Sequence, residues 1–510
     1  MPAIPLRRSL ACGVVLGLTS TGLGAQCAST WSAMAGGVGN SIFVLGLTTL
    51  PNGNVVATGR FTLAGGVPVG QVARWDGVAW SPLGTGVGPQ PWGPEAVASS
   101  AGGDVFVGGY FQQAGTIAAN SIARWDGSSW SALGSGVSGC IGCGVSAITV
   151  LQNGDLIVGG SFDTAGGVPA ACIARWDGSA WSALGQGFDQ NTVLAIAELP
   201  DGSIVAGGSI YSSGGAVVNH LARWDGSSWT SLGGGATGSF VSEFLLLPDG
   251  DLVVAGAFSS AGGVPAANIA IWDGQGFSAL GAGLGDQARS LALLPNGDLV
   301  VGGYFTTAGG VPANGLARWD GTTWSEFGGG VSGGFLTAVH ALATPRPGML
   351  VAGGDFTFAD GLPVGDIAEL SSSCVAAASP YGASCSGAAG PNVMRPTRLP
   401  WIGADFEATT TGLAAGSLSI GLFGFTQVGI PLQASIPLAG NGCLQSVTDD
   451  ITLAFAVTAG EARSSIEIPD DPSIAGGTFH HQLIALEVNG AGQLASVTSS
   501  NAWSLTVGGF

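Results

Sequence analysis

The 510-residue chain contains no lysine and few charged residues of either sign. Asp, Glu, Arg and Lys together make up 9% of the sequence, and His and Tyr occur four times each. Without lysine, Schiff-base chemistry is excluded. Acidic residues outnumber basic ones 32 to 13, which gives a formal net charge of −19. Such a chain repels nucleic acid and anionic membranes, so we expect neither as a partner.

Long apolar runs are missing everywhere except at the N-terminus. Met1–Ala25 has the organisation of a secretory signal peptide, with Arg7 and Arg8 before the apolar centre Leu10–Leu18 and small residues at its end. No other segment reaches the length of a membrane span. We therefore expect a secreted, extracytoplasmic protein, monomeric and without membrane insertion.

Glycine is abundant, with 91 residues, and tryptophan recurs periodically. Twelve of the 15 tryptophans fall in two series, and consecutive repeats are 47 to 51 residues long. The two series are Trp75, Trp125, Trp176, Trp224, Trp272 and Trp319, and Trp31, Trp80, Trp130, Trp181, Trp229 and Trp324. Periods of this length are typical of propeller blades, solenoids or arrays.

Each repeat predicts four short strands. In Val145–Gly187 the apolar runs are Val145–Leu151, Leu156–Gly160, Ile173–Trp176 and Trp181–Leu184. Asn153-Gly154 and Asp177-Gly178 supply hairpin turns between them. No segment beyond the N-terminus has sustained 3.6-residue apolar spacing. The repeat therefore predicts four-stranded antiparallel blades of an all-β propeller.

The two ends of the repeat region predict a closed ring. Trp31–Met34 reads as a fourth strand with no three strands before it, and Phe335–Leu370 supplies three strands with no fourth after them. Six complete units and these two parts make seven blades, with the N-terminal strand completing the last. We expect a seven-bladed β-propeller over residues 27–375, because closure removes exposed sheet edges.

This order of strands, with one ending in Gly-Gly, resembles the kelch and galactose-oxidase-like propeller repeat. The glycine pairs are Gly108-Gly109, Gly159-Gly160, Gly207-Gly208, Gly302-Gly303 and Gly353-Gly354. Arg-Trp-Asp-Gly stands where that family usually carries Tyr-Asp. The strings Leu294–Phe305 and Ala119–Gly134 are similar to the delta-60-type repeats of large bacterial secreted proteins. The resemblance implies a propeller and is almost silent on function.

Residues 380–510 lack the repeat and predict a small β-sandwich. The expected strands are Ser417–Phe425, Ile451–Val457, Ser464–Ile468, Phe479–Val488 and Trp503–Val507. This segment resembles the C-terminal modules of secreted proteins from planctomycete-type bacteria, which open near YGxxC and close near SNAxxLTVG.

Three disulfides are expected, because a secreted chain permits them. Cys27 and Cys374 flank the point where the ring closes, and Cys385 and Cys443 are the two cysteines of the predicted sandwich. Cys140 and Cys143 form a CxxC on a long link. The sequence around them is not thioredoxin-like, and no second CxxC or nearby His completes a zinc site, so we favour a local disulfide. Cys172 is expected to be buried and unpaired.

The propeller has one rim of tight turns and one of longer, more variable links. The long links are Thr85–Glu95, Phe111–Asn120, Gln186–Thr192 and Tyr211–Asn219. Loops on a rigid scaffold usually carry recognition. The candidate binding residues on this long-link rim are Trp92, Gln112, Gln113, Asp189 and Tyr211.

No catalytic or metal-binding constellation emerges from the sequence, and we expect no cofactor and no metal. His220, His340, His480 and His481 are too few and too scattered for a copper site. The repeated arginines of RWDG pair with aspartates in the structural interpretation and form an anion-binding ring in the functional one. Packing repeats in every blade, whereas a site is normally asymmetric, so we favour the structural interpretation.

Two functions remain open. The first is a non-catalytic binding or scaffold protein that recognises a protein or a glycan through the long-link rim. The alternative is a carbohydrate-active enzyme, a hydrolase or lyase, at the mouth of the central channel. Paired carboxylates would serve hydrolysis; Glu95, Asp163, Asp189 and Glu243 lie in or near long links, and nothing singles out two. Carboxylates or histidines at the mouth would favour the enzyme, and small residues there would favour the binding protein.

Overall fold

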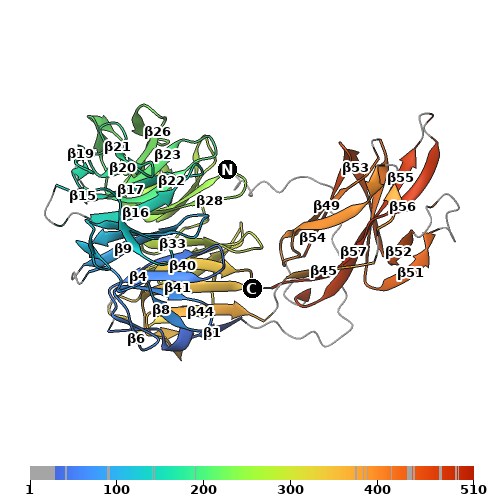
Figure 1. The fold of residues 1–510 in the computed structure, drawn as a ribbon, viewed down its shortest axis with the longest axis horizontal. Helices are drawn as coiled ribbons and strands as arrows, with labels where there is room; N and C mark the ends of the chain where they lie inside the picture. The colour runs from blue at the N-terminus through green and yellow to red at the C-terminus, as the bar shows by residue number, and fades with distance from the viewer. Residues whose placement is uncertain are drawn as a thin grey trace. The chain divides into compact units, whose positions relative to one another are not determined.

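The computed structural model describes residues 29–509 except 41–42, 89–91, 140–141, 143, 190, 374–375, 383, 388, 415, 433–438, 440–442, 449, 470–473, 489–490 and 492. It divides into two compact units, unit 1 (Thr30–Leu294 and Asp298–Ser371) and unit 2 (chiefly Ser372–Phe510). Both consist of β-strands (Figure 1). The expected signal peptide Met1–Ala25 and the expected Cys27–Cys374 and Cys140–Cys143 bridges lie outside the described residues.

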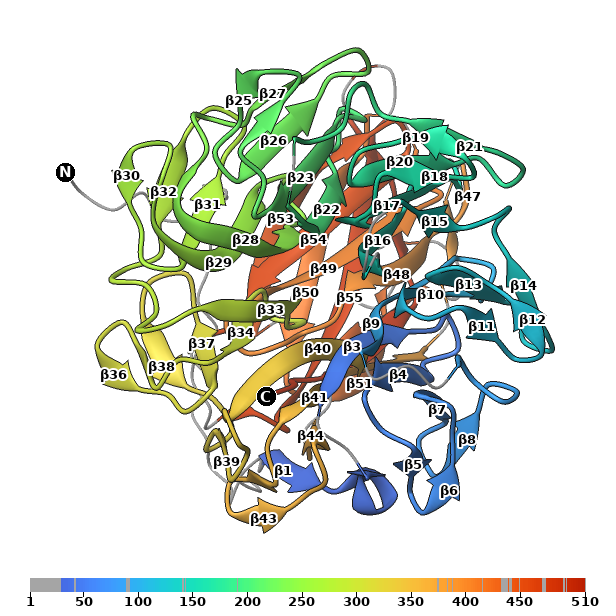
Figure 2. The same cartoon turned by 90° about the vertical axis from the view of Figure 1, so that its left-hand side faces the viewer.

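Unit 1 has β-propeller character. Its described part contains seven antiparallel sheets that share one strand order, four strands each, with a short extra strand on the fifth. The first strands of these sheets are β3 (Val44–Thr49), β9 (Gly93–Ser99), β16 (Gly144–Val150), β22 (Val193–Glu198), β28 (Ala236–Leu246), β33 (Ala288–Leu293) and β40 (Ala338–Arg346). Each contacts the next along the chain, β40 also contacts β3, and Figure 2 shows them around one centre.

The other strands of each sheet follow outward from these first strands. The second strands are β4 (Val55–Gly59), β10 (Val105–Tyr110), β17 (Leu156–Ser161), β23 (Ile204–Gly208), β29 (Leu252–Ala261), β34 (Leu299–Gly303) and β41 (Met349–Asp355). The third are β7 (Val72–Trp75), β13 (Ile122–Trp125), β20 (Ile173–Trp176), β26 (Leu221–Trp224), β31 (Ile269–Trp272), β37 (Leu316–Trp319) and β44 (Ile367–Ser372). The fourth are β8 (Trp80–Pro82), β14 (Trp130–Ala132), β21 (Trp181–Ala183), β27 (Trp229–Ser231), β32 (Phe277–Ala279), β38 (Trp324–Glu326) and β1 (Ser29–Ser32).

The fourth strand of the last sheet comes from the start of the chain. β1 is hydrogen-bonded next to β44 in the order β1-β44-β41-β40. Trp31 donates its indole N–H to the Gly328 carbonyl at 2.6 Å, as the other outer tryptophans do to the preceding repeat. Two segments that are far apart in sequence therefore build one sheet, as the orphan strand predicts.

Five of the seven repeats carry a Gly-Gly pair, and its two glycines have separate packing reasons. A Cβ on Gly159 would lie 2.4 Å from a methyl group of Val193 in the next repeat, so glycine lets these neighbouring sheets approach. Thr58 and Ala255 stand at this position in the other two repeats. A Cβ on Gly160 would lie 2.1 Å from the Gly144 carbonyl oxygen of the paired strand. Gly353 of the last repeat meets Val44 of the first in the same way, at 2.5 Å. The glycine pairs therefore fix the packing of successive sheets.

The RWDG segment stabilises the tight-turn rim. Asp177 accepts the N–H groups of Ser179 and Ala180 at 2.8 and 2.7 Å, which caps the turn between β20 and β21. The arginine two residues earlier pairs with an aspartate in the first turn of the same sheet. The pairs are Arg124–Asp104, Arg175–Asp155, Arg223–Asp201 and Arg318–Asp298. These pairs agree with the structural interpretation for four of the repeated arginines, whereas the buried Nε of the fifth, Arg74, has no described partner.

The links on the other rim carry short hairpins where the sequence predicts only loops. They are β5–β6 (Leu63–Ala64, Val67–Pro68), β11–β12 (Gln113–Ala114, Ile117–Ala118), β18–β19 (Thr164–Ala165, Val168–Pro169), β24–β25 (Ser212–Ser213, Ala216–Val217), β35–β36 (Thr307–Ala308, Val311–Pro312) and β42–β43 (Phe358–Ala359, Leu362–Pro363), with β30 (Val264–Pro265) pairing on β29. In three repeats a strand of the fourth-to-first link joins the hairpin: β2 (Val38–Gly39), β15 (Val137–Ser138) and β39 (Val331–Ser332). A 3-10 turn, Met34–Gly36, follows β1.

Unit 2 is also all-β. Its main strands are β45 (Ala377–Tyr381), β48 (Val393–Arg398), β49 (Asp405–Thr411), β50 (Leu418–Gly424), β53 (Ile451–Thr458), β54 (Glu461–Glu467), β55 (Thr478–Val488), β56 (Leu494–Ser499) and β57 (Ala502–Thr506). The hairpin β53–β54 links β48, β49 and β54 to the remaining strands. Phe406 and Ile466 from the first group pack in one buried cluster with Phe423 and Phe479 from the second. The predicted Cys385–Cys443 disulfide is present.

Candidate functional site

The centre of unit 1 contains a cavity of about 580 Å³ lined by the first strands of all seven sheets. Its apolar wall is formed by repeated aliphatic side chains such as Leu47, Ile148 and Leu342. A volume of this size suits a small organic ligand.

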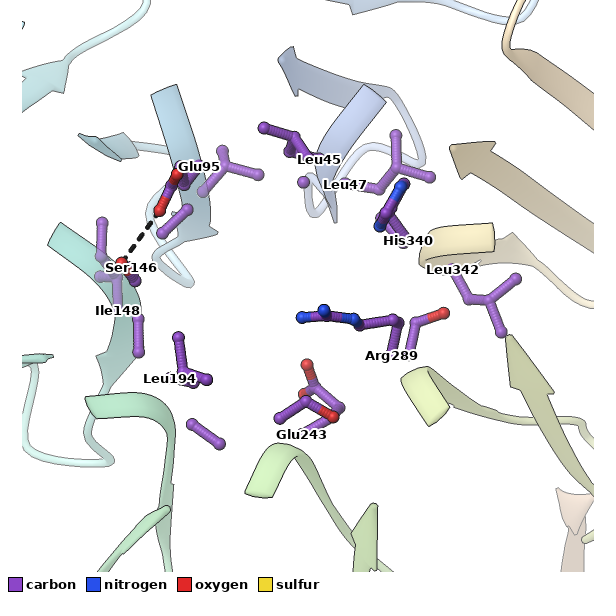
Figure 3. A pocket seen from close by; sticks show the side chains of 18 of the residues that line it. Leu45, Leu47, Glu95, Ser146, Ile148, Leu194, Glu243, Arg289, His340 and Leu342 are labelled. Carbon is purple, nitrogen blue, oxygen red and sulfur yellow. Dashed lines mark hydrogen bonds between the residues drawn. The ribbon is translucent and has the colours of Figure 1, made fainter. Parts of the chain in front are cut away.

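One residue of every first strand is displaced into this cavity by a β-bulge. In β16, for example, Val145 pairs with Gly160 and Ala147 with Gly159, so Ser146 has no partner across the ladder. The same shift occurs in all seven sheets. We call the displaced residues the bulge set: Leu45, Glu95, Ser146, Leu194, Ser242, Arg289 and His340. Figure 3 shows the six of these that it labels around one opening.

The bulge lies opposite one glycine of the second strand, which is the second of the Gly-Gly pair in five sheets and Gly59 or Gly256 in the other two. Because the partner carbonyl approaches this glycine closely, the extra residue of the first strand is turned away from the ladder. The residue after that glycine is the last residue of the second strand or follows it directly in six sheets, and lies within β29 in the fifth. These residues form the rim set: Arg60, Tyr110, Ser161, Ser209, Ala257, Tyr304 and Asp355. Neither set repeats from one sheet to the next, although the residues around both sets do.

Two arginines of these sets lie against aromatic rings. The guanidinium carbon of Arg60 lies 5.0 Å from the Trp92 ring centre and 5.6 Å from that of Phe43. Arg60 also donates from Nε to the Trp92 carbonyl at 3.2 Å. The guanidinium carbon of Arg289 lies 4.9 Å from the Phe240 ring centre and 5.4 Å from that of Tyr304. Such cation–π contacts hold both charges in place at the mouth.

The acidic groups of the cavity have unusual protonation. Burial raises the pKa of Glu243 to about 8, so this side chain is protonated at neutral pH. Burial also raises the pKa of Glu95, while the Ser146 hydroxyl, at 3.0 Å, and the charges of Arg60 and Arg289 act in the opposite direction. The dashed line in Figure 3 marks this Ser146–Glu95 bond.

His340 is neutral at physiological pH. Burial and the positive charges of Arg289 and Arg60 lower its pKa to about 4. Its ring meets Phe43 and Tyr304 edge-on, at 5.6 and 5.4 Å between ring centres. With His340 neutral and Glu243 protonated, the remaining charged groups of the cavity wall are Glu95 and the two arginines. Positive charge is therefore in excess even when Glu95 is ionised.

Of the residues predicted for the long-link rim, the structure brings Trp92 to the mouth through its contacts with Arg60. Gln112 and Gln113 are exposed, and Gln113 donates to the Gly115 carbonyl within its own hairpin, at 2.9 Å. Asp189 accepts from the Ser212 hydroxyl at 2.9 Å. The ring of Tyr211 meets that of His220 edge-on, at 4.6 Å between ring centres. These last four do not line the cavity.

Sequence reasoning missed Arg60, Arg289, Tyr304 and His340 as site residues. The signal that could have found them is the position in the repeat. One position near the start of the first strand, and the one after the glycine that ends the GG, TG or AG pair of the second strand, vary while most of their neighbours stay similar. Glu95 and Glu243 were named only as two of four undifferentiated carboxylates.

No helix in the described part of the chain has the length and hydropathy of a membrane-spanning segment. Within the residues that the structure describes, no three His, Cys, Asp or Glu side chains are grouped so that they could hold a metal ion. Cys172 is buried and unpaired, as predicted, and its thiol donates to the Asn191 carbonyl at 2.9 Å.

Comparison with known families agrees with the propeller character. Residues 199–224, 247–270 and 294–319 match the family described as a domain of unknown function (DUF5122) beta-propeller. Each match runs from the end of a first strand to the end of a third strand in one repeat. The chain is similar to this family over these segments, which make up a minor part of its length.

Among solved structures, 26 chains are similar to this one, including the crystal structure of the WD40 beta propeller domain of Doa1. That domain is 13% identical, with a TM-score of 0.44, and the match covers 67% of this chain and 97% of that one. No curated protein sequence matches the chain.

Proposed function

We propose that this chain is a secreted, non-catalytic binding protein whose unit 1 is a closed seven-bladed β-propeller and whose unit 2 is a β-sandwich. Seven sheets of one strand order support the propeller, as do the contact between β40 and β3 and the pairing of β1 with β44. The two strand groups of unit 2 that share one buried cluster support the sandwich. The N-terminal sequence supports secretion.

The ligand binds at the mouth of the central cavity, on the long-link rim. The observation that carries this proposal is that the bulge set and the rim set break the repeat. Packing positions recur from sheet to sheet because every sheet solves the same packing problem. The mouth instead combines Arg60, Arg289 and His340 with the Glu95–Ser146 pair and with aliphatic residues such as Leu45 and Leu194. This asymmetry is expected of a recognition site.

A carbohydrate-active enzyme is the second candidate, because Glu95, Glu243 and His340 line the cavity. Burial raises the pKa of both Glu95 and Glu243, and two such carboxyl groups could serve as acid and base. In the described structure, however, Glu95 bonds to Ser146, and no described hydrogen bond joins Glu95, Glu243, Tyr304 and His340 to one another. Catalytic groups are recognised first by mutual geometry, so we favour binding.

A glycan array probed with the full mature chain tests this proposal. Ser146→Trp fills the cavity from its wall, and Ala180→Trp places the same side chain on an exposed turn of the opposite rim. We expect binding that survives Ala180→Trp and is lost in Ser146→Trp. Silence across the array, or binding indifferent to Ser146→Trp, would contradict a glycan site at the mouth. Cleavage of a bound oligosaccharide, detected by mass spectrometry, would favour the enzyme.

A further inference from the structure

Arg60 and Arg289 differ from the repeated arginines of unit 1 in their partners. The described ion pairs join Arg124, Arg175, Arg223 and Arg318 to aspartates on the tight-turn rim. The described contacts of Arg60 are instead two rings and a backbone carbonyl. Those of Arg289 are two rings and the Gln287 side-chain oxygen, at 3.1 Å, and its buried Nε has no described partner. Both guanidiniums retain donors for a ligand.

The surrounding groups favour an anion of low charge. A guanidinium binds a carboxylate through paired, charge-assisted hydrogen bonds. Glu243 is protonated at neutral pH, so it does not compete with a ligand carboxylate for the two arginines. His340 is neutral and adds no charge. Two guanidiniums line the cavity, whereas the whole chain carries a net charge of −19. The local positive charge therefore suits one carboxylate, and the field of the whole chain disfavours a multiply charged ligand.

The same rim presents apolar faces that solvent reaches. Trp92 is 58% exposed although its ring holds Arg60, and Phe335 is 92% exposed. Phe335 is held by Asp355 of the rim set, which accepts its N–H at 3.1 Å and that of Leu336 at 2.7 Å. A Cβ on Gly334 would lie 2.0 Å from the Asp355 carbonyl oxygen, so the loop approaches β41 closely. Rings held in this way can pack against the apolar face of a sugar ring.

The cavity wall also supplies neutral hydroxyl groups. Ser146 and Ser242 line it, and Ser242 donates to the carbonyl of Ala288, the neighbour of Arg289, at 2.8 Å, so its oxygen can still accept. Hydroxyl groups in the wall, fixed cations and aromatic faces at the rim match a polyhydroxylated ring that carries one acidic group.

We propose that the mouth of unit 1 binds a uronic acid, free or as a unit of a glycan, with its carboxylate between Arg60 and Arg289 and its ring against the aromatic side chains of the rim. This inference rests on the proposed binding function and names its ligand class.

Isothermal titration of the full mature chain at pH 7 with matched sugars tests the inference. D-glucuronate and D-galacturonate carry a carboxylate where D-glucose and D-galactose carry a hydroxymethyl group, and acetate supplies the carboxylate without a ring. We expect at least one uronate to bind on the order of 10-fold or more tightly than its neutral partner and than acetate. Arg289→Gln and Arg60→Gln should each weaken uronate binding by a similar factor. Arg175→Gln, on the opposite rim, should leave it unchanged.

Two controls keep this test decisive. Circular dichroism and thermal melting show whether each variant is folded, and Arg289→Lys keeps the charge while losing the guanidinium fork, so it should retain part of the affinity. Equal affinity for uronates and neutral sugars, or absence of uronate binding by the native chain, overturns the carboxylate assignment. A neutral glycan lost in Ser146→Trp would leave the proposed function standing while refuting this inference.

Discussion

Replacing Trp181 by Phe should destabilise unit 1, because this side chain joins two repeats through one hydrogen bond. Its indole N–H donates to the Leu133 carbonyl at 2.7 Å, and both residues are buried. The Leu133 carbonyl also accepts the Gly136 N–H at 3.0 Å, so it keeps one donor when the indole is lost. We therefore expect only the contribution of one hydrogen bond, about 1 kcal/mol, to be lost from the free energy of unfolding.

The fifth sheet offers the reverse experiment. It carries Phe277 where other sheets have the outer tryptophan, and its ring lies 4.9 Å from that of Trp272, close to the 5.2 Å between Trp176 and Trp181. Phe277→Trp should supply the missing donor to the Leu232 carbonyl and stabilise unit 1 by about 1 kcal/mol.

Urea denaturation followed by far-ultraviolet circular dichroism measures both changes. Trp92→Phe is the matched control for loss of an indole at an exposed position. The reasoning is refuted if Trp181→Phe is no less stable than this control. It is equally refuted if Phe277→Trp destabilises as strongly as Trp181→Phe, because the indole would then lack the partner that the repeat implies.

Three further predictions concern the disulfide and two titrating side chains. Reduction of Cys385–Cys443, which are 58 residues apart, should lower the stability of unit 2 by about 4 kcal/mol in the chain-entropy model, measured by thermal melting with and without reductant. Burial lowers the pKa of His481 from 6.5 to about 4, so below pH 6.5 the unfolded chain takes up a proton that the folded one does not. Unit 2 should thus lose about 3 kcal/mol between pH 6.5 and 4, and His481→Gln should flatten this dependence in acid melts. Since Glu243 ionises near pH 8, uronate affinity should fall as the pH rises through 8, and titration of Glu243→Gln should show no such fall.

The repeated strands could be predicted closely because the same pattern recurs. Ile173–Trp176 is predicted and observed with identical bounds, and Trp181–Leu184 differs from β21 by one residue. Gly-Gly, Asn-Gly and Asp-Gly mark close approaches and turns that few other residues tolerate. In unit 2, which has no repeat, β55 was predicted to within one residue, whereas β48 and β49 were missed, and their polar, threonine-rich sequences explain why.

The site was harder to predict, because a bulge is a property of the pairing register and leaves no local motif. Arg289 and His340 look like isolated polar residues in apolar strands, and only alignment of the repeats shows that they share one position. Their protonation also depends on neighbours from other repeats, as the effect of Arg289 on His340 shows. Trp92 was predictable because it stands in an insert that other repeats lack.

A crystal structure of the full chain soaked with the tighter-binding uronate is the most direct test of the central claim, that the residues that break the repeat form one binding site. We predict electron density for one sugar at the mouth of unit 1, with its carboxylate within hydrogen-bond distance of Arg60 and Arg289. Density at the tight-turn rim or on unit 2, with the mouth empty, would contradict the claim.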